Sequence, residues 1–225
     1  MLRTFDTNEG YVEALSARIA ALLRAAITIN GRACLAVSGG HSPIALFQAL
    51  SQRSDVDWTR VLVRLVDERF VAPDNADSNE HLVRTYLLTN EARSARFTGL
   101  VCDPANLDRS LEQANRQTEH LDLVVLGMGD DGHTASLFPR AAQLAQGLDP
   151  AQTGRYLHVT PPAASHERIS MTLRALLGAS QLILAIAGQN KRQIYEQAAS
   201  ATTVDYPVSF VLNQTSTPID VYWHA

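Results

Sequence analysis

The residues best suited to acid–base chemistry lie in a glycine-rich segment at positions 127–139. The segment reads GMGDDGHTASLFP and places Asp131 two residues before His133. The ordinary pKa of histidine allows proton transfer near neutral pH, and a nearby carboxylate can orient the ring or stabilise its charged form. The pattern therefore predicts a reaction centre built around these two side chains.

An apolar run directly precedes this segment and predicts how it is positioned. Residues 121–126 read LDLVVL, which is typical of a buried parallel strand that ends where the glycines begin. In open α/β sheets, ligands bind at the carboxyl ends of the strands. Residues 33–37 and 61–66 are two further apolar strands followed by polar segments. If these strands are neighbours, three polar loops meet at one edge of the sheet.

The segment at positions 38–43 reads SGGHSP and follows the first of these strands. Gly39 and Gly40 let the backbone approach a ligand closely, and free N–H groups at a helix N-terminus favour an anion. We expect Ser42 to cap this helix and the following proline to open it. The segment lacks the Gly-Lys-Ser/Thr of a Walker A loop, so a phosphate cradle and an ordinary strand-to-helix turn both fit. His41 alone is more typical of a solvated turn residue than of a ligand.

Three cationic side chains are candidates for contacts with an anionic substrate. Arg69 ends the segment Asp67-Glu68-Arg69 after the second strand, where it could hold an oxyanion or another substrate oxygen. Arg168 and Lys191 fall at or just before predicted helix starts, where a cation does not complement the helix dipole and is free to face an external anion. The alternatives are a solvated turn in which Glu68 and Arg69 pair loosely, and simple exposure of the other two.

Two other kinds of site are disfavoured. The glycines at 127–132 match the dinucleotide pattern GxGxxG. However, Asp130 and Asp131 put negative charge where a pyrophosphate must approach, and Pro139 stops the long helix that the pattern requires. The seven histidines form no i, i+4 pair and have no cysteine cluster nearby, so we expect no metal site.

Alternating helical and strand patterns predict the fold class. Helices are expected at 9–26, 43–50, from 78 toward 88, 107–119, 169–177 and 191–199, and strands at 33–37, 61–66, 121–126, 156–159, 182–187, 208–212 and 219–223. Strands that alternate with helices imply a mostly parallel sheet with helices on both faces, which makes three layers. No linker rich in Pro, Gly or Ser interrupts the pattern, so residues 1–225 are predicted to form a single α/β domain.

Composition sets the broad class of protein. The chain has 225 residues with 46% hydrophobic content, enough for a substantial core. Its formal net charge of -4, without a run of Lys or Arg, disfavours nucleic-acid partners. No apolar run approaches the roughly 20 residues of a membrane span, and the N-terminus lacks the apolar region of a signal peptide. The two cysteines, Cys34 and Cys102, suit a reducing compartment. We therefore expect a cytoplasmic protein with no membrane partner.

Together, these motifs resemble those of the 6-phosphogluconolactonases, enzymes of the oxidative pentose phosphate pathway. The resemblance covers most of the chain. It rests on SGGxxP at 38–43, on DER at 67–69 with Ser78-Asn79 ten residues on, and on the block that ends at Pro139, which is the most specific. Arg168 and the later Gly188-x-x-Lys191 complete it.

The resemblance implies a single α/β domain with a Rossmann-like sheet, and hydrolysis of 6-phospho-D-glucono-1,5-lactone to 6-phosphogluconate without a cofactor. His133 matches the family's proposed general base, Asp131 its acidic neighbour, and Arg69 the arginine near the reacting end. Ser38–Ser42, Arg168 and Lys191 match positions that face the phosphate. The full set of expected substrate-binding residues is Ser38, Gly39, Gly40, His41, Ser42, Asp67, Asn79, Arg168 and Lys191. We expect a monomer whose only partner is this small substrate.

Two residues depart from the family pattern: His41 stands where Ser or Thr is commoner, and Arg140 follows Pro139 where glycine is usual. The related glucosamine-6-phosphate deaminases carry a glutamate five residues after the histidine, where this chain has Phe138, and an aromatic residue where it has Arg69. Ring opening and amine loss need extra proton transfer, so this difference favours simple hydrolysis. A sugar-phosphate sensor without catalysis is an alternative of another class, and retention of the three catalytic side chains argues against it.

Overall fold

A parallel sheet of apolar strands forms the centre of the molecule, for which the computed structural model describes residues 2–225. Its strands are β1 Leu2–Phe5, β2 Ala33–Val37, β3 Val61–Leu65, β5 Arg96–Phe97, β6 Leu123–Leu126, β9 Leu182–Ala187 and β10 Ile219–His224. They lie in the order β1-β10-β9-β6-β2-β3-β5, and every neighbouring pair is parallel. All residues of β2 and β6 are buried, as expected for a parallel sheet that is covered on both faces.

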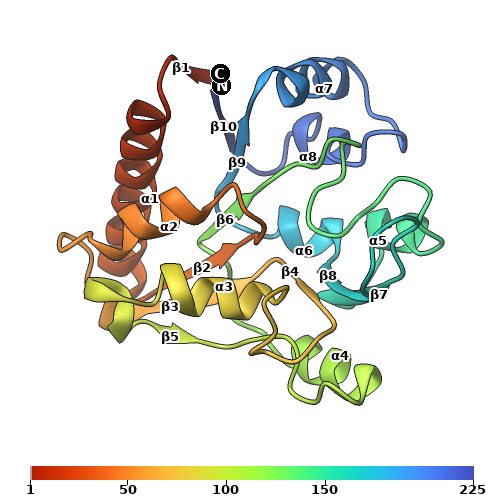
Figure 1. Cartoon of the computed structure of the whole chain (residues 1–225), viewed down its shortest axis with the longest axis horizontal. Helices are drawn as coiled ribbons and strands as arrows, with labels where there is room; N and C mark the ends of the chain where they lie inside the picture. Colours follow the sequence, from red (N-terminus) through yellow and green to blue (C-terminus); the bar gives the residue numbers. More distant parts are fainter. Residues whose placement is uncertain (1) are drawn as a thin grey trace.

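Helices cover this sheet on both faces. They are α1 Asn8–Asn30, α2 Ile44–Ser51, α3 Asn79–Tyr86, α4 Leu107–Asn115, α5 Leu144–Leu148, α6 Leu173–Leu177, α7 Gln189–Ser200 and α8 Ser209–Leu212, with two short 3₁₀ helices at Trp58–Arg60 and Asn90–Ser94. In Figure 1, α1 and α2 lie on one side of the central strands, and α6, α7 and α8 lie on the other. The predicted α/β class with a mostly parallel sheet is therefore confirmed.

A second, three-stranded antiparallel sheet corrects one sequence prediction. Its strands are β4 Asp67–Arg69, β8 Arg168–Met171 and β7 Tyr156–Val159, in that order across the sheet. The helix expected at 169–177 is wrong in its first part, because residues 168–171 are buried and pair with both neighbouring strands. The Thr172 side chain accepts a hydrogen bond from the Ala175 backbone N–H, so α6 begins only after that cap.

Other sequence predictions of elements and their ends are also corrected. The closing strand expected at 208–212 is wrong, since this segment forms α8. A short apolar run has the same pattern in a buried strand and a buried helix, so periodicity does not separate the two. The helix expected at 107–119 ends at Asn115. Ser42 does not cap α2, which begins at Ile44 with Pro43 at its N-cap position and no side-chain cap.

The carboxyl ends of the central strands bring the glycine-rich loops together. β2 lies between β3 and β6, and the Ser38 backbone N–H donates to the Val125 carbonyl at 3.0 Å. β9 is the next neighbour of β6, and the turn after it leads into α7 and Lys191. The predicted meeting of loops at one sheet edge is therefore confirmed.

Among the helices of residues 2–225, none combines the length and apolar character that a membrane crossing requires.

Candidate active site

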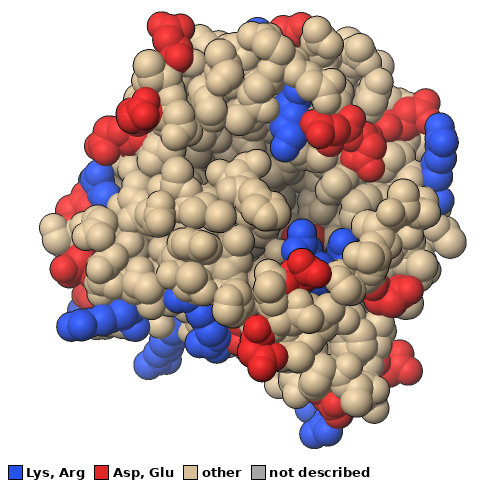
Figure 2. All heavy atoms as spheres, viewed as in Figure 1, with Lys and Arg blue, Asp and Glu red and all other residues tan. Residues whose placement is uncertain are grey.

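A cleft of about 310 Å³ opens at this edge of the sheet. Figure 2 shows the hollow in the same view as Figure 1, with Lys and Arg side chains on opposite sides of it. Most of the predicted site residues line the cleft: Ser38, Gly39, Gly40, His41, Ser42, Asp67, Arg69, Asn79, His133 and Lys191. Asp131 and Arg168 lie outside the lining, each next to a residue that belongs to it.

The loop after β2 presents a row of free backbone donors beside the cleft. Within the described chain, the N–H groups of residues 39–42 donate to no protein acceptor. Gly40 has a φ of +92°, a conformation that favours glycine. Successive N–H groups around such a bend form a concavity that suits an anion, and the positive end of α2 lies directly behind it.

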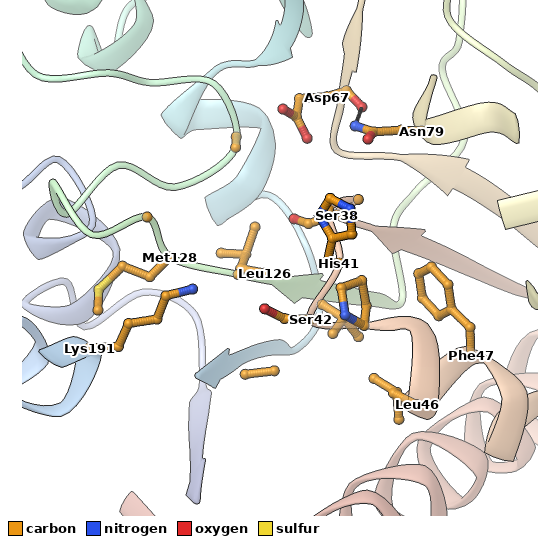
Figure 3. Close-up of a pocket in the computed structure, with 18 of the residues that line it drawn as sticks. Ser38, His41, Ser42, Leu46, Phe47, Asp67, Asn79, Leu126, Met128 and Lys191 are labelled. Carbon is orange, nitrogen blue, oxygen red and sulfur yellow. Dashed lines mark hydrogen bonds between the residues drawn. The ribbon is translucent and has the colours of Figure 1, made fainter. Parts of the chain in front are cut away.

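Gly39 packs against the side chain of Asn79, the first residue of α3. A Cβ atom at position 39 would lie 1.9 Å from Asn79 Oδ1, so only glycine fits there. Asn79 Nδ2 donates to the Asp67 carbonyl at 2.8 Å, a bond drawn in Figure 3. Asn79 Oδ1 and Ser38 Oγ are buried and have no hydrogen-bond partner among the described residues. Because buried polar atoms are normally paired, these two are suited to bind substrate hydroxyl groups.

Glu68 lies between two cleft residues, Asp67 and Arg69, and connects their strand to α3. Its side chain is buried, and its carboxylate accepts hydrogen bonds from Ser78 Oγ and from the backbone N–H groups of Arg69, Asn79 and Glu80, at 2.7–3.0 Å. Burial raises the pKa of Glu68 to about 7, although these hydrogen bonds oppose the increase. The alternative of a solvated turn with a loose Glu68–Arg69 pair is therefore wrong. The carboxylate instead joins β4 to the start of α3.

Two buried serines that the sequence analysis did not single out hold Asp67 in place. Asp67 Oδ2 accepts a hydrogen bond from Ser136 Oγ at 2.5 Å, and the Ser136 N–H donates to Ser170 Oγ at 3.0 Å. Both serines are fully buried. Ser136 belongs to the specific block at 127–139 and could have been found there, whereas nothing in the local sequence marks Ser170. Their contacts fix Asp67 relative to the histidine loop.

His133 and Asp131 form the close pair that their spacing predicts. His133 Nδ1 lies 2.5 Å from Asp131 Oδ1, so Nε2 is the ring nitrogen without a partner among the described residues. Partial burial alone would raise the pKa of Asp131, but the hydrogen bonds from His133 outweigh this effect and lower that pKa. A Cβ atom at position 129 would lie 2.2 Å from the His133 ring, so this packing requires Gly129.

Phe138 fills the space beside the imidazole. Its ring packs against His133 with 4.3 Å between the ring centroids and 45° between their planes. Phe138 is buried and supplies no group that can donate or accept a proton. The contact therefore restricts the imidazole ring and leaves His133 and Asp131 as the acid–base pair of this loop.

The predicted cations divide between two parts of the site. Arg69 on β4 and Arg168 on β8 lie directly opposite each other in the antiparallel pair. The prediction that Arg168 lies at a helix start is wrong, since it is buried within a strand. Burial and then the charge of Arg69 lower the pKa of Arg168. Lys191, in the first turn of α7, extends into the cleft beside Met128 and toward the loop that carries Ser42 (Figure 3).

Apolar residues that the sequence analysis assigned no site role also line the cleft. They come from α1, α2, β6 and β9: Tyr11, Val12, Leu46, Phe47, Leu126 and Ala185. Their spacing is that of core positions, and only packing shows that the same faces wall the cleft.

Arg140 occupies a backbone conformation that favours glycine, with a φ of +66°. This conformation destabilises the folded state by about 1–2 kcal/mol when the residue carries a Cβ atom. Glycine loses more conformational freedom on folding, which offsets about 0.5–1 kcal/mol of the stability gained by replacing the residue with glycine. We therefore expect Arg140→Gly to increase Tm by roughly 1–4 °C in calorimetry, as a stabilisation of up to about 1 kcal/mol implies for a chain of this size. Arg140→Ala removes the charge but retains the Cβ atom, and should leave Tm unchanged. Equal increases in both variants would contradict this explanation.

The arrangement defines a class of α/β protein. Its sheet edge combines a loop with free N–H groups, a histidine–carboxylate pair and several cations around one small cleft, which is typical of enzymes that act on small phosphorylated compounds. The sequence profile of the family described as Glucosamine-6-phosphate isomerases/6-phosphogluconolactonase matches residues 6–223. The chain belongs to this family.

Individual relatives agree with this assignment. The 6-phosphogluconolactonase of Neisseria meningitidis serogroup A is 42% identical over 216 residues, which cover 94% of this chain and 93% of that protein. The 6-phosphogluconolactonase of Rhizobium meliloti (strain 1021) is 39% identical over 227 residues, covering 99% and 97%. The crystal structure of a 6-phosphogluconolactonase from Shewanella baltica OS155 has a TM-score of 0.94 at 39% identity, covering 100% of this chain and 97% of that one. The family resemblance found in the motifs is therefore confirmed.

Proposed function

We propose that this chain is a 6-phosphogluconolactonase, which hydrolyses 6-phospho-D-glucono-1,5-lactone to 6-phosphogluconate in the pentose phosphate pathway. Relatives with that name match nearly its whole length at 39–42% identity. One geometric observation carries the mechanism. His133, supported by Asp131 and with a free Nε2, lines the same cleft as Arg69 and the free N–H groups of residues 39–42.

The substrate phosphate binds to the backbone N–H groups of residues 39–42 and to Lys191. A phosphate monoester carries a charge of about −1.5 to −2 at neutral pH, so these hydrogen bonds are charge-assisted. The departure at His41 leaves this cradle intact, because the donors are backbone groups. The net negative charge of the protein opposes binding only weakly, since salt screens distant charges over about 8 Å.

With the phosphate bound, the lactone carbonyl lies near His133. His133 Nε2 accepts a proton from water while the water oxygen attacks the carbonyl carbon, and Asp131 stabilises the imidazolium that forms. Arg69 stabilises the oxyanion of the tetrahedral intermediate, with the positive charge of Arg168 beside it. The family resemblance implied that Arg168 faces the phosphate, and we assign it to the oxyanion instead because it lies opposite Arg69 on the neighbouring strand. The bond between the carbonyl carbon and the ring oxygen then breaks, and the imidazolium returns its proton to that oxygen. The products are the open-chain acid and a neutral histidine.

Phe138 favours this reaction over the other activity in the family description. Deamination of an amino sugar phosphate involves ring opening and loss of an amine, which require additional proton transfers. The position beside His133 carries a buried aromatic ring that cannot take part in them. Lactone hydrolysis needs only one base and a donor to the oxyanion, and the cleft contains both.

The proposal is tested by assaying the purified protein for lactone hydrolysis at neutral pH. Freshly prepared 6-phosphogluconolactone is the substrate, and the rate of spontaneous opening is subtracted. We expect turnover with added chelator and no cofactor, and a much lower kcat/KM for the unphosphorylated lactone. No acceleration over the spontaneous rate would contradict the proposal, and release of ammonia from glucosamine-6-phosphate would favour the deaminase alternative.

Lys191→Ala is expected to increase KM about 10- to 100-fold, which corresponds to the roughly 1.5–3 kcal/mol of a hydrogen bond to a charged group. The phosphate is bound alike in the ground and transition states, so kcat should change little in steady-state kinetics. Arg192→Ala is the matched control, because Arg192 pairs with Glu196 and lies over the Trp223 ring. An equal increase of KM in the control, or a normal KM in Lys191→Ala, would contradict the phosphate assignment.

We also propose that the enzyme is a single-domain cytoplasmic monomer that acts without a cofactor. The residues given roles in the mechanism above all lie in this chain and near one another, which supports a site that one copy completes. Both cysteines are free, which suits a reducing compartment. Hydrolysis by an activated water requires no redox group or group carrier.

A further inference from the structure

His166 and Asp77 join two loops next to the paired arginines. Asp77 lies between β4 and α3, and His166 lies between β7 and β8. His166 Nε2 and Asp77 Oδ2 are 3.0 Å apart. Neither residue has a place in the mechanism above, and neither lines the cleft.

The same two residues hold the arginines through their backbone carbonyl groups. Arg69 Nη1 donates to the Asp77 carbonyl, and Arg168 Nη1 donates to the His166 carbonyl, each at 2.6 Å. Arg69 and Arg168 are themselves opposite each other in the β4–β8 pair. We call this closed ring of Arg69, Asp77, His166 and Arg168 the arginine clasp. Within it, the side-chain contact between Asp77 and His166 links the two carbonyl groups that hold the guanidinium groups.

The arginines require such a constraint. Two like charges on adjacent strands repel, and the charge of Arg69 contributes to the lowered pKa of Arg168. Arginine side chains also have many rotamers, so without a partner the two guanidinium groups would move apart. The Asp77 side chain is 63% exposed and that of His166 is 31% exposed, so core packing does not explain their contact.

The charged surroundings of His166 are mixed. Asp77 faces it from the loop before α3, Arg168 and Glu167 follow it in the chain, and Glu167 is itself paired with His158 at 2.5 Å. Asp77 is therefore the carboxylate that His166 has available for its own hydrogen bond.

We propose that His166 and Asp77 are positioning residues, which hold Arg69 and Arg168 at the spacing that stabilises the oxyanion. This inference rests on the proposed lactone hydrolysis and adds two residues to it. The ground-state carbonyl is neutral and the negative charge develops only in the transition state. Loss of the clasp should therefore lower kcat more than it changes KM.

The test compares the kinetics of clasp variants with a control in the same loop. His166→Leu and Asp77→Ala should each lower kcat about tenfold with KM within about twofold, since small displacements of catalytic groups have effects of this size or larger. The double variant should lose no more than either single variant, because both act through one contact. His166→Gln retains an N–H donor and should recover most of the lost kcat. Glu167→Ala breaks the contacts to His158 and Thr160 but keeps every hydrogen bond of the clasp, and should keep a normal kcat.

Several results would overturn the clasp. One is a normal kcat in both His166→Leu and Asp77→Ala. Another is a loss of kcat in Glu167→Ala equal to that in the clasp variants. A third is a higher KM with an unchanged kcat in the clasp variants. A crystal structure of His166→Leu in which both arginines keep their native positions would also overturn it, whatever the activity. Failure of the unmodified protein to hydrolyse the lactone is a separate result, which contradicts the proposed function instead.

Discussion

His133→Ala is expected to lower kcat by about 10²- to 10⁴-fold, the usual contribution of a positioned general base. KM should change little, because the backbone donors of residues 39–42 and Lys191 remain available to the phosphate. Steady-state kinetics with the spontaneous rate subtracted will measure both constants.

The chain provides a matched control for this prediction. His158 is also bonded to a carboxylate, Glu167 at 2.5 Å, but it lies outside the cleft. His158→Ala should therefore retain a normal kcat. An unchanged kcat in His133→Ala, or equal losses in the two variants, would refute the assignment of His133 as the base.

Arg69→Met should lower kcat by about 10²- to 10³-fold, the usual effect of removing one donor to an oxyanion. Methionine retains much of the side-chain volume and removes the charge, so the effect reports the lost guanidinium group. KM should rise much less than kcat falls, since the carbonyl oxygen is neutral until water attacks. The same steady-state kinetics give both constants, and Arg69→Lys should show an intermediate kcat because it keeps the charge with fewer fixed donors.

Arg84→Met is the control for loss of an arginine near this part of the protein. Arg84 lies on α3, pairs with Glu80 and packs over the Phe97 ring, away from the cleft. Its replacement should leave kcat unchanged. A large increase in KM with a normal kcat in Arg69→Met would contradict this role. It would show that Arg69 binds a substrate group with which it interacts equally in the ground and transition states.

Local sequence determined the parts of this protein that depend on local physics. Apolar runs such as 121–126 predicted buried strands, because burial on both faces of a parallel sheet requires them. Gly129 marks a point where a Cβ atom would collide with the ring of His133, four residues further along the same loop. The spacing of Asp131 and His133 places the two side chains within one loop, so their contact follows from the segment itself.

Tertiary structure alone decided the features that join distant parts of the chain. Nothing near residues 168–171 shows that they form a strand opposite Arg69, since their apolar pattern fits a helix equally well. The contact of Asp67 with Ser136 and the clasp between Asp77 and His166 likewise depend on which strands pair and in which register. A shift of one residue in register turns every side chain of a strand to the opposite face. Sequence chemistry thus determined which groups the site has available, and long-range pairing decided which of them meet.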